Sequence, residues 1–162
     1  MRLAIRWRWS VRDERWRQEV QRAHEIQMAM LPDGDVSAEK IVISGYCHPA
    51  EDVGGDYYDY LPLEGNQLSL ILADVMGHGF YAGLLVAMVK SCLHTQTRTD
   101  ASPAAVMEAM NRTVFSSVQS GLLMTCCYLV FDFQKPTLHS SNPRHPFPYH
   151  SFRATYRRCT CR

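Results

Sequence analysis

Two acidic, glycine-containing segments that bracket one apolar run constrain this chain more than any other feature. The segments are Asp52-Val53-Gly54-Gly55-Asp56 and Asp74-Val75-Met76-Gly77-His78-Gly79, and the apolar run covers residues 68–73. Carboxylate and carbonyl oxygens are the ligands that Mg²⁺ and Mn²⁺ prefer, and such ions often act in pairs on phosphate groups. Glycine has no Cβ, so its backbone can come close to an ion or a phosphate. The pattern predicts a metal site that acts on phosphate.

Longer stretches around these acids match a known family. Val53-Gly54-Gly55-Asp56-Tyr57-Tyr58-Asp59 and Ala73-Asp74-Val75-Met76-Gly77-His78-Gly79 resemble the signatures of the SpoIIE-type branch of the PPM metal-dependent protein serine/threonine phosphatases. Shorter segments on both sides of these motifs also match, in the family's order, at residues 26–32, 46–50, 88–91, 124–125 and 142–146. The resemblance implies an α+β fold, a PPM phosphatase-like α-β-β-α sandwich of antiparallel sheets with flanking helices, incomplete at its C-terminus.

The resemblance also implies the ligands of the site. Asp74 is expected to bridge two Mn²⁺ or Mg²⁺ ions, with the backbone carbonyl of Val75 as a further ligand, and Asp56 is expected to bind one of the ions. His78 could relay a proton to the leaving oxygen. The residues themselves leave alternatives open, because Asp74 could cap the next helix, Asp56 could be a turn residue and His78 could be structural.

Other residues near these ligands are weaker candidates. Gly55, Gly77 and Gly79 are expected to shape the backbone around the ions and the phosphate. Asp52 and Asp59 could bind a metal through water or simply be solvated. The segments at residues 124–125 and 142–146 are expected to support the ligands from behind, although core packing explains the methionine equally well.

The order of expected elements places these motifs on a scaffold. Patterning predicts a helix over residues 12–30, strands over 41–47, 57–63 and 67–73, helices over 80–95 and 103–118, and strands over 122–132 and 137–141. A hairpin turn at Glu64-Gly65-Asn66 would bring Asp56 and Asp74 together from neighbouring strands. The helix over 80–95 is apolar on nearly every side, so we expect it to be buried.

A length of 162 residues favours one domain with flanking segments. We expect a basic N-terminal segment and linker helix at residues 1–32, a partial phosphatase domain at 33–150 and an unstructured basic tail at 151–162. The linker helix could form a homodimer or pack on its own domain. Basic ends flank an acidic middle, which suits a cation site, and solvated termini are favoured over contacts with nucleic acid or anionic lipid.

Six cysteines and no secretory signal predict reduced thiols and a cytoplasmic protein. Cys159-Thr160-Cys161 misses the usual spacing of zinc ligands, and Cys126-Cys127 lacks the loop of a cysteine phosphatase. No apolar run reaches the roughly 18 residues that a membrane span needs. By resemblance, the partner would be a phosphorylated regulatory protein such as an anti-sigma-factor antagonist.

The chain departs from the family near its end. The family's Asn-Ala-Gly-His-Pro element is Asn142-Pro143-Arg144-His145-Pro146 here, and no acid follows Asp132. Two late metal-binding aspartates of the family therefore have no counterpart, and we expect a truncated domain. Two functions remain open from the sequence: an active phosphatase, and an inactive pseudophosphatase that acts as a binding or dimerisation module.

Overall fold

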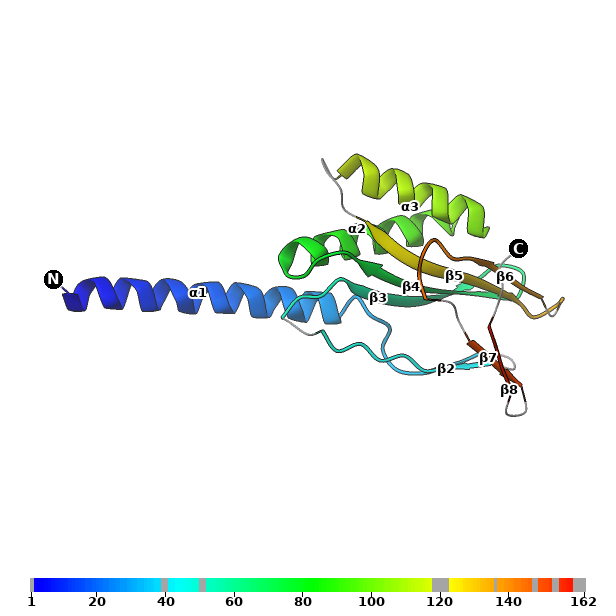
Figure 1. The fold of residues 1–162 in the computed structure, drawn as a ribbon, viewed down its shortest axis with the longest axis horizontal. Helices are drawn as coiled ribbons and strands as arrows, with labels where there is room; N and C mark the ends of the chain where they lie inside the picture. Colours follow the sequence, from blue (N-terminus) through cyan, green and yellow to red (C-terminus); the bar gives the residue numbers. More distant parts are fainter. Residues whose placement is uncertain are drawn as a thin grey trace.

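A four-stranded antiparallel sheet with two helices on one face forms the body of the molecule (Figure 1). The structure, a computed structural model, describes residues 2–38, 41–49, 52–117, 123–135, 137–146, 149–152 and 155–158, with side chains described between residues 13 and 146 of these ranges. The elements are α1 (Arg2–Met28), β1 (Val36–Ala38), β2 (Ile41–Ile43), β3 (Asp56–Leu63), β4 (Gln67–Val75), α2 (Phe80–Gln96), α3 (Pro103–Ser117), β5 (Met124–Asp132), β6 (Thr137–Ser141), β7 (Tyr149–Phe152) and β8 (Thr155–Arg158).

The main sheet has the strand order β3-β4-β5-β6. The tight hairpin between β3 and β4 sets its register, because Leu63 pairs with Gln67 across a three-residue loop. Gly65 and Asn66 in this loop have positive φ angles of 75° and 58°, which glycine and asparagine tolerate better than other residues. The predicted hairpin is confirmed, and so are the strands at β5 and β6.

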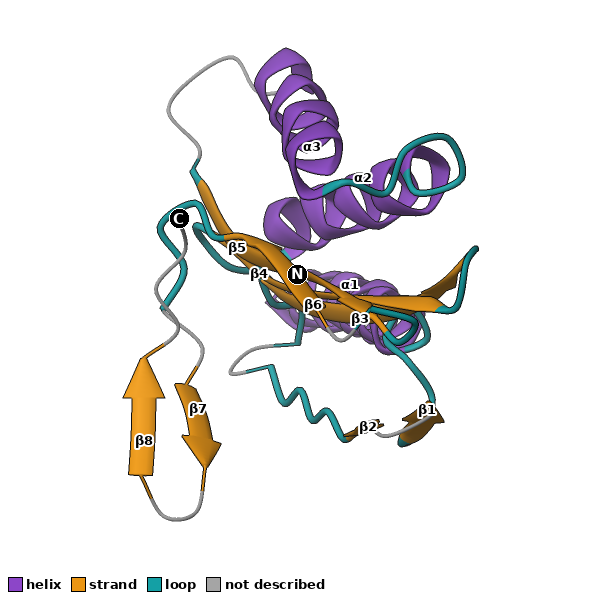
Figure 2. Cartoon of the chain, turned by 90° about the vertical axis from the view of Figure 1, so that its right-hand side faces the viewer, coloured by secondary structure: helices purple, strands orange, loops and turns teal. Residues whose placement is uncertain are grey.

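Helices α2 and α3 cover one face of the sheet, and the core lies between the two layers (Figure 2). Alternate residues of β4 point into this core, namely Ile71, Ala73 and Val75. Because side chains alternate across a strand, the residues between them, including Leu72 and Asp74, lie on the opposite face and are exposed. Because only the face of β4 toward the helices is buried, Asp74 on its other face reaches solvent.

Helix α2 is buried along one side only. Ala82, Leu85, Val86, Val89 and Leu93 pack into the core, whereas Phe80, Tyr81 and Leu84 are about half exposed. The prediction that this helix would be buried all round was wrong. An apolar residue on the outer side of a helix can lie against a neighbouring element or face solvent, and composition alone does not distinguish the two.

Helix α1 projects beyond the rest of the molecule (Figure 1). It begins at Arg2, ten residues before the predicted start. From its middle onward it contacts α2, and the rings of Trp16 and Phe80 stack with centroids 6.2 Å apart. The part of the chain that the structure describes has no helix that is both long and apolar enough to cross a bilayer.

Two short hairpins lie on the side of the main sheet away from α2 and α3 (Figure 2). Strand β2 is shorter than the predicted strand over residues 41–47, and it pairs with β1, which was not predicted. Strand β7 begins two residues before the predicted tail at 151–162 and pairs with β8. This hairpin lies outside the main sheet, and the boundary between domain and tail stays a prediction.

A buried carboxylate fastens β3 to α2. Oδ2 of Asp59, a residue only 5 % exposed, accepts hydrogen bonds from Tyr57 Oη at 2.7 Å, Lys90 Nζ at 2.7 Å and His94 Nε2 at 2.8 Å. Its Oδ1 accepts the backbone N–H of Tyr60 at 2.9 Å. Burial by itself raises the pKa of Asp59, but the hydrogen bonds from Lys90, His94 and Tyr57 outweigh it, so the pKa lies below the ordinary value.

Asp59→Asn should lower the free energy of unfolding at pH 7 by about 2 to 3 kcal/mol, because it leaves Lys90 without its counter-charge. A carboxylate with a depressed pKa stabilises the fold above its unfolded value of 3.8, and this contribution is lost as pH falls through the folded pKa. Urea denaturation at pH 7 and at pH 3 should therefore show a large gap between variant and parent at pH 7 and a small one at pH 3. The exposed Glu64→Gln serves as the control, and equal stability of Asp59→Asn and parent at pH 7 would contradict this account.

Candidate metal and phosphate site

The register of the β3–β4 hairpin places Asp56 directly opposite Asp74. Both side chains are exposed, and directly opposite residues of an antiparallel pair project from the same face with Cβ atoms about 5 Å apart. The predicted meeting of these two acids across adjacent strands is confirmed. Their role as metal ligands stays a prediction.

A close backbone contact fixes this end of the hairpin. A Cβ added to Gly55 would lie 2.2 Å from the carbonyl oxygen of Val75, which real Cβ atoms do not tolerate. The amide of Val75 donates to the carbonyl of Gly55 at 3.0 Å. Position 55 therefore requires glycine, and the Val75 carbonyl is held beside the two acids.

The turn after β4 depends on two glycines with positive φ angles, 105° at Gly77 and 77° at Gly79. The amide of Gly79 donates to the Val53 carbonyl at 2.9 Å, which ties this turn to the loop before Asp56. Helix α2 begins at the next residue, Phe80. Both acidic segments are thus joined by backbone hydrogen bonds at one end of the sheet.

Helix α1 reaches the same loop through the buried side chain of Gln27, which lies in the family-like segment 26–32 but had no predicted role. Gln27 is 5 % exposed, and its amide donates to the Gly54 carbonyl at 2.7 Å while accepting the Gly54 N–H at 2.9 Å. Its burial follows from this pair of bonds, which a single sequence does not reveal. Gln27 therefore holds the loop that leads into Asp56.

Strand β5 adds a third polar residue to the row of acids. Thr125 pairs with Asp74 in register, so its side chain projects from the same face beside that acid. The hydroxyl of Thr125 lies 3.1 Å from Nδ1 of His145. The segments at residues 124–125 and 142–146, expected to support the site, do lie beside it.

Cys47 lies within electrostatic reach of the acid pair. Burial and, to a smaller extent, the negative charge of Asp56 raise the pKa of the Cys47 thiol. A raised pKa keeps this thiol protonated near neutral pH, so it is a poor metal ligand and a poor nucleophile.

The remaining predicted residues fall in different places. His78 is exposed within the turn between the two glycines, and Asp52 is exposed in the loop before β3. Asp59 is neither solvated nor a ligand held through water, because it faces the helices, on the opposite side of β3 from Asp56. Strand alternation explains the difference, since residues three apart on a strand project from opposite faces.

The acid pair fits one hard cation. Two carboxylates from a rigid hairpin and a nearby backbone carbonyl supply oxygen donors, and Mg²⁺ usually keeps several waters besides a few protein ligands. Within the described ranges, no three His, Cys, Asp or Glu side chains converge as a metal-binding group. A second ion would share Asp74 and would have few other protein ligands.

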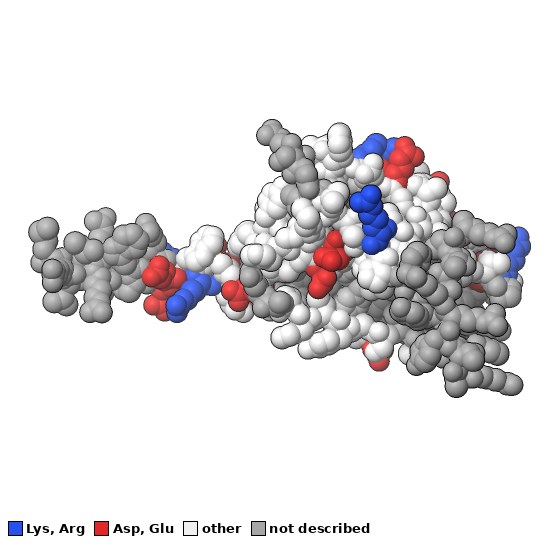
Figure 3. Space-filling model, viewed as in Figure 1, with Lys and Arg blue, Asp and Glu red and all other residues white. Residues whose placement is uncertain are grey.

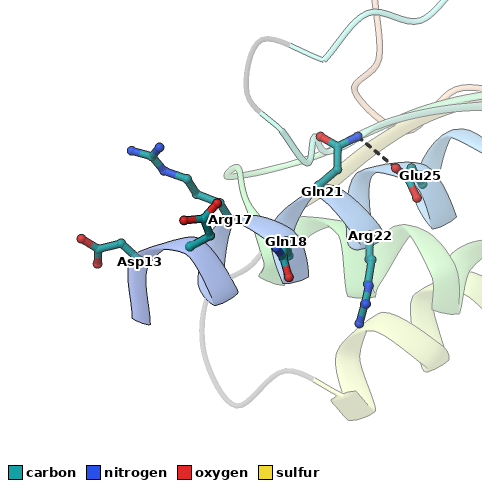
Figure 4. Close-up of a pocket in the computed structure, with 7 residues that line it drawn as sticks. Asp13, Arg17, Gln18, Gln21, Arg22 and Glu25 are labelled. Carbon is teal, nitrogen blue, oxygen red and sulfur yellow. Dashed lines mark hydrogen bonds between the residues drawn. The ribbon is translucent and has the colours of Figure 1, made fainter. Parts of the chain in front are cut away.

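Two hollows lie away from the acids. One follows α1 and is lined by Asp13, Glu14, Arg17, Gln18, Gln21, Arg22 and Glu25. Figure 4 shows that these side chains spread from a single helix, with Gln21 donating to Glu25. The other lies between α1 and α2, where Ile26, Phe80 and Leu84 make it apolar. Neither hollow presents a set of converging metal ligands.

Comparison with solved structures identifies the class of fold. The SiaA-PP2C domain of Pseudomonas aeruginosa superposes with a TM-score of 0.64 at 18 % identity, over 80 % of this chain and 54 % of that one. The RsbU and RsbW domains of Rv1364c from Mycobacterium tuberculosis give a TM-score of 0.54 at 29 % identity, over 59 % of this chain and 27 % of that one. The molecule has a PP2C-like α+β fold.

The family follows from the sequence comparisons. The family model for Stage II sporulation protein E (SpoIIE) matches residues 64–156, more than half of the chain, so the chain belongs to the SpoIIE family of PPM-type phosphatases. Phosphoserine phosphatase RsbU of Bacillus subtilis is 26 % identical over 72 % of this chain and 35 % of its own length. Phosphoserine phosphatase RsbP of the same organism is 26 % identical over 80 % of this chain and 33 % of its own length. The chain thus spans about a third of these relatives.

Gly55→Ala should destabilise the fold by about 2 kcal/mol, because the new methyl group would overlap the Val75 carbonyl oxygen and push the hairpin end apart. The matched control is Gly54→Ala, whose Cβ would meet only Pro49 at 3.3 Å. Thermal denaturation of both variants measures the effect. A Gly55→Ala protein as stable as Gly54→Ala would show that the close approach is not a constraint.

Proposed function

We propose that this chain is the metal-binding part of a SpoIIE-type protein phosphatase that hydrolyses phosphoserine or phosphothreonine in the cytoplasm. The observation that carries the proposal is the register pairing of Asp56 with Asp74 on an exposed face. Membership of the SpoIIE family supports the reaction class. Relatives described as phosphoserine phosphatases support the choice of a phosphorylated side chain as substrate.

In this proposal the two acids and one carbonyl hold the cation. Asp74 and Asp56 would hold the cation from neighbouring strands, and the Val75 carbonyl would add a neutral oxygen. Rigid strands suit this task, because ligands on strands keep their geometry better than ligands on loops. A Mn²⁺ or Mg²⁺ ion held there supplies Lewis acidity toward water and toward a phosphate oxygen.

The turn after β4 is proposed to bind the substrate phosphate and to assist the leaving group. His78 is exposed in the turn that follows Asp74 along the chain, and it is suited to carry a proton to the leaving serine or threonine oxygen. Gly77 and Gly79 have no Cβ, so a phosphate can approach the backbone at these two positions. Helix α2 starts directly after this turn, and the positive end of its dipole favours an anion.

The proposed substrate is a phosphorylated regulatory protein, such as an anti-sigma-factor antagonist. The support is indirect: two relatives are phosphoserine phosphatases, and one structural relative carries an RsbW domain beside its RsbU domain. A panel of phosphopeptides with serine, threonine and tyrosine tests the class. Faster hydrolysis of phosphotyrosine than of the other two would contradict it.

Asp74→Asn should reduce the Mn²⁺-dependent release of phosphate from a phosphoserine peptide by at least about a hundredfold. Even residues that only orient metal ligands cost 10- to 100-fold when changed, and Asp74 is proposed to be a ligand. The exposed Asp33→Asn makes the same chemical change away from the site and should leave the rate unchanged. Equal rates for parent and Asp74→Asn would count against the phosphatase.

A second function is favoured by the small number of acids. Since the described residues hold no group of three metal-binding side chains, the chain could be a catalytically silent module that binds a phosphoprotein without hydrolysing it. Calorimetric titration with Mn²⁺ separates the two functions. The silent module should bind one ion weakly or none, whereas two tightly bound ions would rule it out.

Helix α1 is proposed to form a homodimer. Trp16 and Ile26 are more than half exposed on this projecting helix. Acidic and basic side chains are interspersed along the visible, described part of the helix (Figure 3), so two copies need not repel each other there. Sedimentation velocity of parent and Ile26→Glu tests this, with Gln18→Glu as a matched polar control. A parent protein that sediments as a monomer at all concentrations would contradict the dimer.

A further inference from the structure

The turn that follows β6 places a histidine, His145, next to a row of polar residues that includes the two acids. Three residues from three neighbouring strands form this row: Asp56 on β3, Asp74 on β4 and Thr125 on β5. His145 extends the row, with its Nδ1 atom 3.1 Å from Thr125 Oγ1. Both Thr125 and His145 are half-buried, so each keeps an exposed part.

Several backbone interactions fix the turn that holds His145. The amide of Cys126 donates to the carbonyl of Pro143 at 3.3 Å, and the amide of His145 donates to Oδ1 of Asn142 at 3.0 Å. Arg144 forms an isolated bridge with Cys126 and has a φ angle of 63°. A non-glycine residue is strained in this region and persists there only where its surroundings enforce it, often at functional sites.

The same turn contains a donor that has no acceptor. Nδ2 of Asn142 is buried and makes no hydrogen bond, and the bond from His145 to Oδ1 sets the orientation of this amide. Buried unpaired donors are rare in folded proteins and call for an explanation. A site that binds an oxygen-rich anion is one such explanation, because the anion supplies acceptors.

From these contacts we propose that Thr125 and His145 form a hydrogen-bonding subsite for an oxygen of the substrate phosphate, next to the acid pair. The inference rests on the proposed phosphatase function and deepens it. When His145 donates from Nδ1 to Thr125 Oγ1, the threonine hydroxyl keeps its own proton for a phosphate oxygen. Thr125 would then touch the phosphate, and His145 would act as the positioning residue that orients the hydroxyl.

The chemistry at this end of the sheet calls for such donors. The acids Asp56 and Asp74 repel a phosphate unless a cation neutralises them, and neutral donors beside them bind phosphate oxygens without adding charge. Within the described ranges Lys and Arg form no salt bridge with either acid, because Arg22 pairs with Glu19, Lys90 with Asp59 and Arg112 with Glu108. The Thr125 hydroxyl, paired with Asp74 in register, and the His145 imidazole next to it are polar groups of this kind beside the acids.

Calorimetry on the full chain tests the subsite in two steps, first with Mn²⁺ alone and then with inorganic phosphate added to the Mn²⁺-loaded protein. His145→Ala and Thr125→Val should each weaken phosphate binding by about tenfold, the effect of one hydrogen bond to a charged group. Both variants should bind Mn²⁺ within about twofold of the parent, since neither residue is a proposed ligand. His139→Ala, an exposed histidine on the adjacent strand β6, is the matched control and should change neither affinity.

The possible results separate this inference from the proposed function. If both variants bind Mn²⁺ normally and bind phosphate as tightly as the parent, the subsite is wrong and the metal site stands. A lower melting temperature with unchanged phosphate affinity would show that the Thr125–His145 contact only secures the turn. If the parent protein takes up no Mn²⁺, the proposed function fails first and the subsite fails with it.

Discussion

The antiparallel pairing of β3 with β4 is the constraint on which the site depends. A three-residue loop fixes the register at one end of the hairpin, and seven residues along each strand from the pair that closes this loop the same register sets Asp56 against Asp74. A slip of one residue would turn every side chain of one strand to the other face. The core side chains of β4, such as Ile71 and Val75, would then face solvent. Their burial under α2 and α3 therefore disfavours such a slip and keeps Asp56 opposite Asp74.

Charge is divided between the two faces of this sheet. On the helix side, Asp59 is buried and accepts hydrogen bonds from Tyr57, Lys90 and His94. These bonds link strand β3 to helix α2. On the other side, Asp56 and Asp74 are exposed beside each other and are matched by no cation of the described chain. Asp56 and Asp59 lie on the same strand, β3. They differ in role because strand alternation places them on opposite faces of the sheet.

The sequence predicted the hairpin, α2, α3, β5 and the meeting of the acids, because these depend on short-range patterns: alternation, turn residues and helix formers. It did not predict the burial of Asp59 or Gln27, since each depends on a partner about 30 residues away. The exposed side of α2 was missed because it depends on which elements lie against the helix. The pairing of β1 with β2 is local and was missed because each strand has only three residues, too few for alternation to be read. Family resemblance carried the fold class, which periodicity alone does not specify.

The proposed function requires that one divalent cation bind between the carboxylates of Asp56 and Asp74. Anomalous diffraction from crystals of the chain soaked in Mn²⁺ tests that claim without reference to activity. We expect a peak within coordinating distance of one oxygen from each acid, about 2.2 Å. A well-occupied peak elsewhere, or the two carboxylates turned apart with no peak between them, would contradict the account.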